Sequence, residues 1–409
     1  MRRSSRSASY ATQGGNRASE RTLDTVTTQP KGSLLSEELC AQWLRDLGQE
    51  AKRFRFEVAP NPCVGAAVVS EDRIIGQGFH EVFGQDHAEI RALAAARASG
   101  VPAKSWDAMI VTLEPCSTRG KTPPCVEAIL ESGIRRVVVG EIDPDARHRG
   151  EGLRALRAAG IEVQLLEGVA ELRKVSPHFL AWTSDDRIRR PRPWTIAKWA
   201  QTRTGQLVPP PDIGEGRWIS GPESLSEVQV LRGRVDAIVS SVGTVLRDDP
   251  RLTVRPPGDV SKPPLRVILD SRLRTPPTAT LLKTAGPGEA GGEVHILCVA
   301  GEDEARHRAL TEAGAKIHEL HAATDDGVSL RDAHTWMWEL GLRRIVVEAG
   351  PRMLTHHLQG GFVDQVRVYT GAVNGGEGLS MADWMTRLKF RERLDRECGP
   401  DAVLEAFLA

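Results

Sequence analysis

Apolar and polar residues alternate along the chain in two periods, which predict helices and strands in turn. Leu39, Trp43, Leu47 and Ala51 recur every four residues, as on one face of a helix, and Ser36 is suited to cap its N-terminus. Short apolar runs then predict strands at 64–69, 73–79, 108–113, 135–140 and 161–166, and helical spacing predicts helices at 87–99 and 150–160. This alternation predicts a mostly parallel sheet that is covered by helices on both faces.

A second alternation follows a charged, proline-rich stretch, 183–193, which we interpret as a linker. Strands are expected at 194–200, 236–241, 265–270, 294–299, 344–350 and 364–370, and helices at 224–234, 302–314, 332–341 and 353–359. The pattern therefore predicts two α/β domains, at 34–182 and 194–409. Residues 1–33 are rich in Arg, Ser and Gly and poor in large apolar residues, so we expect a disordered tail. Organelle targeting through this tail is the less favoured alternative.

Composition excludes several classes of protein. The 409 residues are 40% hydrophobic and 26% charged with a formal net charge of zero, which is ordinary for a soluble protein and gives no reason to expect nucleic acid as a partner. No apolar run approaches the roughly 20 residues that span a bilayer, so we expect no membrane association. Six cysteines in so long a chain are typical of cytosolic thiols or metal ligands, and we expect a cytoplasmic protein.

One group of residues carries chemistry. His87 and Glu89 open a predicted helix, Cys116 follows Pro115 after a predicted strand, and Cys125 follows two prolines that favour a helix start. The pattern H-x-E, then P-C and a second cysteine, is typical of zinc deaminases. One histidine and two cysteines leave the fourth tetrahedral position of a zinc ion for water, whose pKa the metal lowers. A neighbouring carboxylate, here Glu89, can then move a proton to the leaving amine.

Simpler interpretations compete with this one. A structural zinc site normally has four protein ligands, and His80 or Cys63 could in principle supply the fourth. A disulfide between Cys116 and Cys125 is sterically possible, although it is unusual in a cytosolic protein. Glu89 could merely be an acidic residue in the first helical turn that stabilises the helix through its dipole. Only the combination of residues favours a catalytic zinc over these alternatives.

The wider stretches resemble a known family. Residues 61–69, 76–93, 111–129 and 143–163 resemble the deaminase half of the bifunctional riboflavin-pathway deaminase–reductases, the RibD type. Residues 192–205, 216–221, 230–255, 265–276 and 345–354 resemble the reductase half. The resemblance extends from about Leu39 to the C-terminus. It implies a cytidine-deaminase-like three-layer α/β/α domain followed by a dihydrofolate-reductase-like α/β domain.

The resemblance also implies two consecutive reactions on a small phosphorylated pyrimidine. The first is the zinc-dependent hydrolytic deamination of 2,5-diamino-6-ribosylamino-4(3H)-pyrimidinone 5′-phosphate. The second is the reduction of the ribosyl group of the product to ribityl with NADPH. It further implies one Zn²⁺ in each deaminase site and assembly into a homodimer or homotetramer, with neither nucleic acid nor membrane as a partner.

Residue by residue, the resemblance assigns roles in both halves. His87, Cys116 and Cys125 match the zinc ligands, and Glu89 matches the proton shuttle. Lys198 matches a catalytic lysine near the reacting ribose. The positions that match substrate contacts are Asn61, His80, Lys121, Arg232, Leu252, Arg255 and Glu348. The positions that match cofactor contacts are Ala200, Trp218, Thr244, Asp248, Ser271, Gly350, Pro351, Arg352, Met353 and Leu354.

The sequence departs from the family pattern at a few positions. Thr118 stands where a histidine is usual, Thr204 stands where an aspartate is usual, and Gly216 replaces a serine. Three prolines at 209–211 occupy a segment that is short in the family. Except for Thr118, these changes lie near the part of the reductase site where the nicotinamide is predicted to bind. The departures leave two alternatives open. One is a deaminase with a degenerate reductase domain. The other is a tRNA-editing deaminase, favoured by the basic tail but not by the spacing of Cys116 and Cys125, since such enzymes commonly have P-C-x-x-C.

Overall fold

The computed structural model describes residues 35–120, 123–211, 218–259, 261–285, 291–301, 303–323 and 327–409. The predicted disordered tail, 1–33, lies outside the described residues, as do Lys121 and Gly216. Residues 35–409 group as one unit, which holds two separate main sheets. Within the described ranges, no helix is long and apolar enough to cross a membrane.

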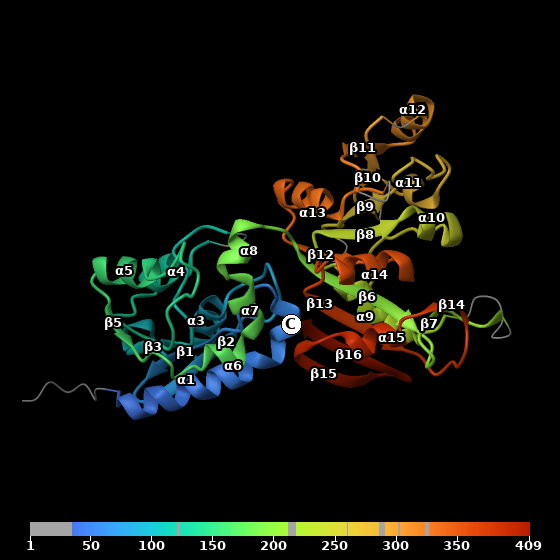
Figure 1. Ribbon diagram of the computed structural model, residues 1–409. Coiled ribbons are helices and arrows are strands. Elements are labelled where there is room, and N and C mark those ends of the chain that lie inside the picture. Colours follow the sequence, from blue (N-terminus) through green and yellow to red (C-terminus); the bar gives the residue numbers. More distant parts are fainter. Residues whose placement is uncertain are drawn as a thin grey trace, which may run out of the picture. The chain divides into compact units, whose positions relative to one another are not determined.

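The first sheet has the strand order β2-β1-β3-β4-β5 (Figure 1). Its strands are β1 (Gly65–Ser70), β2 (Arg73–Phe79), β3 (Ala108–Val111), β4 (Arg136–Val139) and β5 (Glu162–Leu165). The β3–β4 and β4–β5 pairs are parallel, whereas β1 pairs antiparallel with both β2 and β3. The prediction of a mostly parallel sheet is therefore wrong for half of these pairings, because β1 and β2 form a hairpin that periodicity alone does not orient.

Helices cover both faces of this sheet, as predicted. Successive strand residues point to opposite faces, so Ile110 packs in one cluster with α1 (Glu37–Ala51), and Met109 in another with α3 (Ala88–Ala98), α4 (Cys125–Ser132) and α5 (Glu151–Ala158). The predicted cap of α1 is confirmed, since the Leu39 N–H donates to Ser36 Oγ at 3.2 Å. Of the face predicted for α1, Leu47 and Ala51 are buried, whereas Leu39 and Trp43 are half-buried and the next residues, Cys40 and Leu44, are buried instead.

Six short helical segments lie before, between and after the strands of the first sheet. They are η1 (Lys52–Phe54), α2 (Arg55–Val58), η2 (Ala103–Ser105), α6 (Leu172–Val175), α7 (Pro177–Trp182) and α8 (Asp185–Arg189). Helix α8 lies inside the stretch interpreted as a linker. There Asp364, from the second sheet, accepts hydrogen bonds from Arg187 and Arg192.

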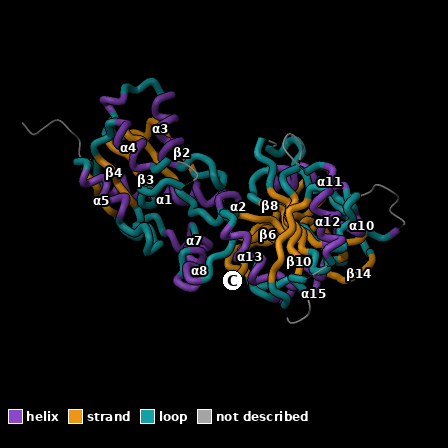
Figure 2. The backbone as a smooth tube through the Cα atoms, turned by 90° about the horizontal axis from the view of Figure 1, so that it is seen from above, coloured by secondary structure: helices purple, strands orange, loops and turns teal. Residues whose placement is uncertain are grey.

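The second sheet has nine strands in the order β11-β10-β9-β8-β12-β6-β13-β16-β15. Figure 2 shows it in orange around the labels β6, β8 and β10. All pairings from β11 to β13 are parallel, and the β13–β16 and β16–β15 pairings are antiparallel. The strands are β6 (Trp194–Gln201), β8 (Ala237–Ser241), β9 (Leu265–Leu269), β10 (Val294–Val299), β11 (Ala315–Leu320), β12 (Arg344–Val347), β13 (Gln365–Thr370), β15 (Phe390–Cys398) and β16 (Asp401–Leu408). A separate pair joins β7 (Gln206–Val208) to β14 (Glu377–Ser380).

Helices also cover both faces of the second sheet. One face packs in a cluster with α9 (Pro222–Arg232), α10 (Val242–Asp248), α11 (Thr280–Lys283) and α12 (Glu304–Glu312). The other packs with α13 (Leu330–Glu339), α14 (Pro351–Gln359) and α15 (Ala382–Arg387). All six strands predicted for this part of the chain are confirmed, whereas β7, β11, β14, β15 and β16 were not predicted.

Candidate active sites

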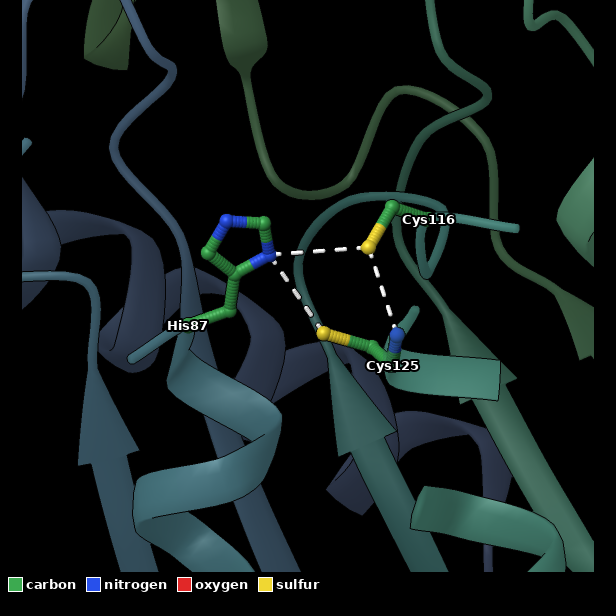
Figure 3. Close-up of side chains that lie close together, drawn as sticks. All are labelled: His87, Cys116 and Cys125. Carbon is green, nitrogen blue, oxygen red and sulfur yellow. Dashed lines mark hydrogen bonds between the residues drawn. The ribbon is translucent and has the colours of Figure 1, made fainter. Parts of the chain in front are cut away.

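The three predicted zinc ligands converge at one edge of the first sheet (Figure 3). His87 Nδ1 lies 3.6 Å from Cys116 Sγ and 3.4 Å from Cys125 Sγ, and all three ligand atoms lie within 4.8 Å of one another. Tetrahedral zinc with ordinary Zn–N and Zn–S bonds separates such atoms by about 3.6 Å. The donor set therefore fits a zinc ion. His87 and Cys125 stand at the starts of α3 and α4, and Cys116 stands on the loop after β3.

The alternatives for these residues do not fit the geometry. Cys116 and Cys125 are both thiols and form no disulfide with each other. Cys63 packs in a different cluster with Ala51 and Val58, and burial raises the pKa of its thiol to about 12. By contrast, hydrogen bonds from Cys125 and His87, opposed by burial, lower the pKa of Cys116 to about 4, and the thiolate is the form that binds metal.

Two neighbouring side chains complete this site. Glu89 lies in the first turn of α3, is 3% exposed, and has its pKa raised chiefly by burial. Such a carboxyl group is suited to proton transfer near neutral pH. His80 lies edge-on to His87 with 5.0 Å between ring centroids, and burial lowers its pKa to about 3. Its Nε2 lies 3.2 Å from Asn61 Nδ2 and its Nδ1 lies 3.2 Å from the Asp86 carbonyl, so the neutral ring satisfies both groups and is not a fourth ligand.

Glu114 supports the cysteine loop and was not anticipated from the sequence. Its buried carboxylate accepts backbone hydrogen bonds from Asp143, Gly150 and Gly152 at 3.1, 2.9 and 2.8 Å. It thereby ties the residue two before Cys116 to the loop that precedes α5. A glutamate directly before Pro115-Cys116 was the only signal available for this role. The exposed Thr118 lies in the same loop, on the solvent side.

A large cleft opens on the second sheet. It has a volume of about 2160 Å³ and is lined by every predicted reductase residue except Leu354. Leu354 is fully buried in the core cluster with Val347 and Met353, and its N–H donates to the Gly350 carbonyl within α14. The structure therefore does not place Leu354 in the cleft. The start of α14, at Gly350 and Pro351, does face it.

Three charged groups meet on one wall of this cleft. Arg232 Nε and Nη2 donate to Glu348 Oε1 and Oε2 at 2.7 and 3.0 Å, and Lys198 Nζ lies 3.7 Å from Oε2. Burial raises the pKa of Glu348, but Arg232 and Lys198 outweigh it and hold the pKa at about 2. Burial is also the main reason that the pKa of Lys198 is lowered. The wall therefore presents a lysine whose proton is held less firmly than usual, beside a fully ionised carboxylate.

Three further cleft residues, Arg255, Leu252 and Trp218, lie outside the helices and strands. Arg255 is exposed, and its backbone N–H donates to Gln229 Oε1 at 2.9 Å. Leu252 is buried at φ 50, a left-handed conformation that leucine rarely adopts. Trp218 is 73% exposed. Thr204 is not among the lining residues, since its hydroxyl accepts the Gly375 N–H at 2.9 Å.

Comparison with known proteins matches both halves. The family model described as the RibD C-terminal domain matches residues 193–403, which is half of the chain. The family model described as the cytidine and deoxycytidylate deaminase zinc-binding region matches residues 39–141. The riboflavin biosynthesis protein RibD of Aquifex aeolicus is 37% identical over 361 residues, covering 87% of this chain and 94% of the relative. That of Escherichia coli is 33% identical over 375 residues, covering 87% and 95%.

The chain belongs to the RibD family of riboflavin biosynthesis proteins. Solved structures agree: Acinetobacter baumannii RibD is 28% identical with a TM-score of 0.64, and it covers 91% of this chain and 99% of its own. The diaminohydroxyphosphoribosylaminopyrimidine deaminase/5-amino-6-(5-phosphoribosylamino)uracil reductase of Thermotoga maritima is 27% identical with a TM-score of 0.61 and the same coverage. The predicted fold class is thus confirmed in both halves.

Family membership fixes the broad function of this RibD protein. It is a bifunctional enzyme of riboflavin biosynthesis that acts on a small molecule, with a zinc-binding deaminase half and a reductase half. The reductase half implies a nicotinamide cofactor. The His87, Cys116 and Cys125 cluster provides the zinc site that the deaminase family requires.

Proposed function

We propose that the deaminase half removes the exocyclic amine of 2,5-diamino-6-ribosylamino-4(3H)-pyrimidinone 5′-phosphate, and that the reductase half converts the ribosyl group of the product to ribityl. Water replaces the amine, and ammonia leaves. NADPH bound in the cleft would supply the hydride for the sugar carbon, and the ring oxygen would take up a proton as the sugar opens. The convergence of His87, Cys116 and Cys125, with Glu89 beside them, carries the first assignment.

In the deaminase half, each residue has a separate task. A zinc ion held by His87, Cys116 and Cys125 supplies a Lewis acid that activates water. Glu89, buried and with a raised pKa, holds the proton that must reach the departing amine. Asn61 and His80 lie within hydrogen-bond distance of each other and would orient the pyrimidine ring. Lys121 would bind the substrate phosphate, a role that rests on the family resemblance because it lies outside the described residues.

In the reductase half, the nicotinamide carries the hydride and the protein positions it. Lys198 and Glu348, which form a buried ion pair on the cleft wall, would contact the ribose and assist the opening of its ring. The N-terminus of α14, at Gly350 to Met353, is suited to the cofactor pyrophosphate because its free N–H groups and helix dipole favour anions. Ala200, Trp218, Thr244, Asp248 and Ser271 line the same cleft and would contact the rest of NADPH.

The proposal also covers the domain boundaries, the cellular location and the assembly of the protein. We propose domain boundaries near residues 182 and 194, because the two family models match on either side of them. We also propose a cytoplasmic location and a homodimeric or homotetrameric assembly, both on the resemblance to the family.

One experiment tests both activities together. The purified protein receives the diaminopyrimidinone phosphate and NADPH, and ammonia and NADP⁺ are followed in the same reaction. Glu89→Ala should abolish both signals, because the second step needs the product of the first. Lys198→Ala should abolish NADP⁺ formation and leave ammonia release intact. Ammonia release by Glu89→Ala would contradict the deaminase assignment, and normal NADPH oxidation by Lys198→Ala would contradict the reductase assignment.

A further inference from the structure

A short segment of the deaminase half is buried in the core of the reductase half. Residues 55–61, which we call the docking segment, lie between α1 and β1 in the chain. Phe56 and Ala59 belong to the same hydrophobic cluster as Trp194, Ile238 and Phe407 of the second sheet. The Phe56 and Phe407 rings lie 4.6 Å apart. The docking segment is therefore part of the core that the reductase strands build.

Polar groups of the reductase half also bind the backbone of this segment. Arg344, fully buried at the start of β12, donates from Nη1 to the Glu57 carbonyl at 2.6 Å and from Nη2 to the Phe56 carbonyl at 2.9 Å. Gln365 donates to the same Phe56 carbonyl at 3.3 Å. A buried guanidinium that binds two successive carbonyls fixes the position of the backbone between them, because both bonds share one rigid plane.

The Glu57 side chain adds a charged anchor. Its carboxylate accepts from Arg367 Nη2 and from Arg234 Nη1, each at 2.6 Å. Burial raises the pKa of Glu57, but the surrounding arginines hold it well below its usual range, so the carboxylate is ionised. Arg234, Arg344 and Arg367 all come from the reductase half. The anchor thus joins one residue of the docking segment to three distant positions.

The docking segment ends at Asn61, the residue proposed to contact the pyrimidine. The Asn61 N–H donates to the Val58 carbonyl at 2.9 Å, and the Asn61 carbonyl accepts from His178 Nε2 at 2.8 Å. The His178 ring in turn lies 4.6 Å from the ring of Phe407. One support of Asn61, His178, therefore contacts the reductase half directly, and the other, Val58, directly follows Glu57, which the reductase half binds. From Asn61 the contacts continue to His80 and then to the zinc ligand His87.

We propose that the reductase half positions the substrate-binding residues of the deaminase site, with Arg344 as the main positioning residue. The proposal rests on the proposed function insofar as it assigns Asn61 to the pyrimidine. The zinc ligands stand on α3, α4 and the β3 loop, which pack on the first sheet and not on the docking segment. Loss of the anchor should consequently weaken substrate binding while leaving zinc in place.

The test compares KM with kcat in the full-length enzyme. Arg344→Met removes the two hydrogen bonds but leaves no carbonyl unpaired, since the Phe83 N–H donates to Glu57 and Gln365 donates to Phe56. We expect KM for the diaminopyrimidinone phosphate to rise by about tenfold or more, because a displacement of about 1 Å is costly in an active site. Zinc content, kcat for ammonia release, and NADPH oxidation with the deaminated intermediate should stay near wild type. Arg344→Lys should recover part of the affinity.

The matched control is Arg192→Gln. Arg192, in the stretch interpreted as a linker, makes comparable contacts to Asp364 and the Gly361 carbonyl of the reductase half, and these hydrogen bonds do not involve the docking segment. Its KM should be unchanged. An unchanged KM in Arg344→Met, or an equal rise in Arg192→Gln, would overturn the proposal. If Arg344→Met does not fold, Glu57→Gln tests the charged part of the anchor, the bonds to Arg234 and Arg367, without altering β12, and KM should rise there too.

A second measurement separates this proposal from the proposed function. Hydrogen exchange of the Ala59 and Asn61 amides, both bonded within the docking segment, should accelerate in Arg344→Met and not in Arg192→Gln. This readout needs no substrate. If the wild-type enzyme released no ammonia, the proposed function would fail while accelerated exchange would still support the anchor. Unchanged exchange would refute the anchor even in an active enzyme.

Discussion

Glu348→Gln tests how the reductase cleft tolerates three charged groups on one wall. The Glu348 carboxylate is 11% exposed and lies 2.7 Å from Arg232 and 3.7 Å from Lys198. Its pKa falls from 4.5 to about 2 because these two cations outweigh the effect of burial. At 1.36 kcal/mol for each pKa unit, this shift corresponds to about 3 kcal/mol. Since the folded-state pKa is the lower one, this stabilisation is complete above pH 4.5 and is lost as the pH falls toward 2.

We expect Glu348→Gln to lose about 3 kcal/mol of unfolding free energy at pH 7, because it also leaves Arg232 and Lys198 side by side without an anion. At pH 3.5 the difference from wild type should be smaller by about 1 kcal/mol, since part of the wild-type stabilisation is then lost. Urea unfolding at both pH values, followed through the transition in which reductase activity disappears, measures both quantities. The double variant Arg232→Met/Glu348→Met should be less destabilised than the sum of its single variants. Equal stability of Glu348→Gln and wild type at pH 7, or a difference that does not change with pH, would refute this reasoning.

Three further predictions concern the deaminase half. In Gly152→Ala the new Cβ would lie 2.0 Å from the Pro115 carbonyl oxygen, so the loop that carries Cys116 must shift and the zinc content should fall. Gly120→Ala is the control, because its Cβ would meet nothing within 4 Å. Cys125→Ser should lose zinc and ammonia release together while it still reduces the supplied deaminated intermediate; metal analysis and NADPH oxidation check this, and retained zinc would contradict the ligand assignment. Asp143→Asn should stabilise the protein above pH 6 by up to about 3 kcal/mol and have no effect near pH 3, because burial raises the pKa of Asp143 from 3.8 to about 6 and its ionisation disfavours folding. Thermal unfolding at pH 4 and pH 8 measures this last difference, and a variant less stable than wild type at pH 8 would count against it.

The zinc ligands could be predicted from the sequence because each stands at a point that local signals mark. His87 and Cys125 begin helices, and Cys125 follows two prolines that favour a helix start. The start of α14 was predictable for the same reason. Leu354, which matches a cofactor contact of the family, does not line the cleft, because its N–H bonds to the Gly350 carbonyl and its side chain is buried in the core.

The C-terminal hairpin was missed because charged residues occupy inward positions of its edge strand. In β15 the half-buried positions alternate as a strand requires, but they include Glu392 and Arg396. Glu392 pairs with Lys52 and Arg55, and Arg396 pairs with Glu227. An apolar–polar pattern cannot reveal such a strand, since the partners that neutralise its charges lie far away in the sequence. The roles of Glu114 and Arg344 could not be predicted for the same reason, because both side chains bind backbone groups that are distant in the sequence.

The geometry of the cleft distinguishes Arg232 from Arg255, the two arginines that match substrate contacts of the family. Arg232 directs Nε and Nη2 to Glu348 and Nη1 to the Thr253 carbonyl at 3.0 Å, so protein acceptors occupy three of its five N–H groups. One N–H on Nη1 and one on Nη2 remain for a substrate phosphate while Arg232 keeps Glu348 ionised. Arg255 is exposed in the same cleft, with its backbone fixed by Gln229. We therefore expect the exposed Arg255 to bind the substrate phosphate more extensively than Arg232, which also holds Glu348 ionised beside Lys198.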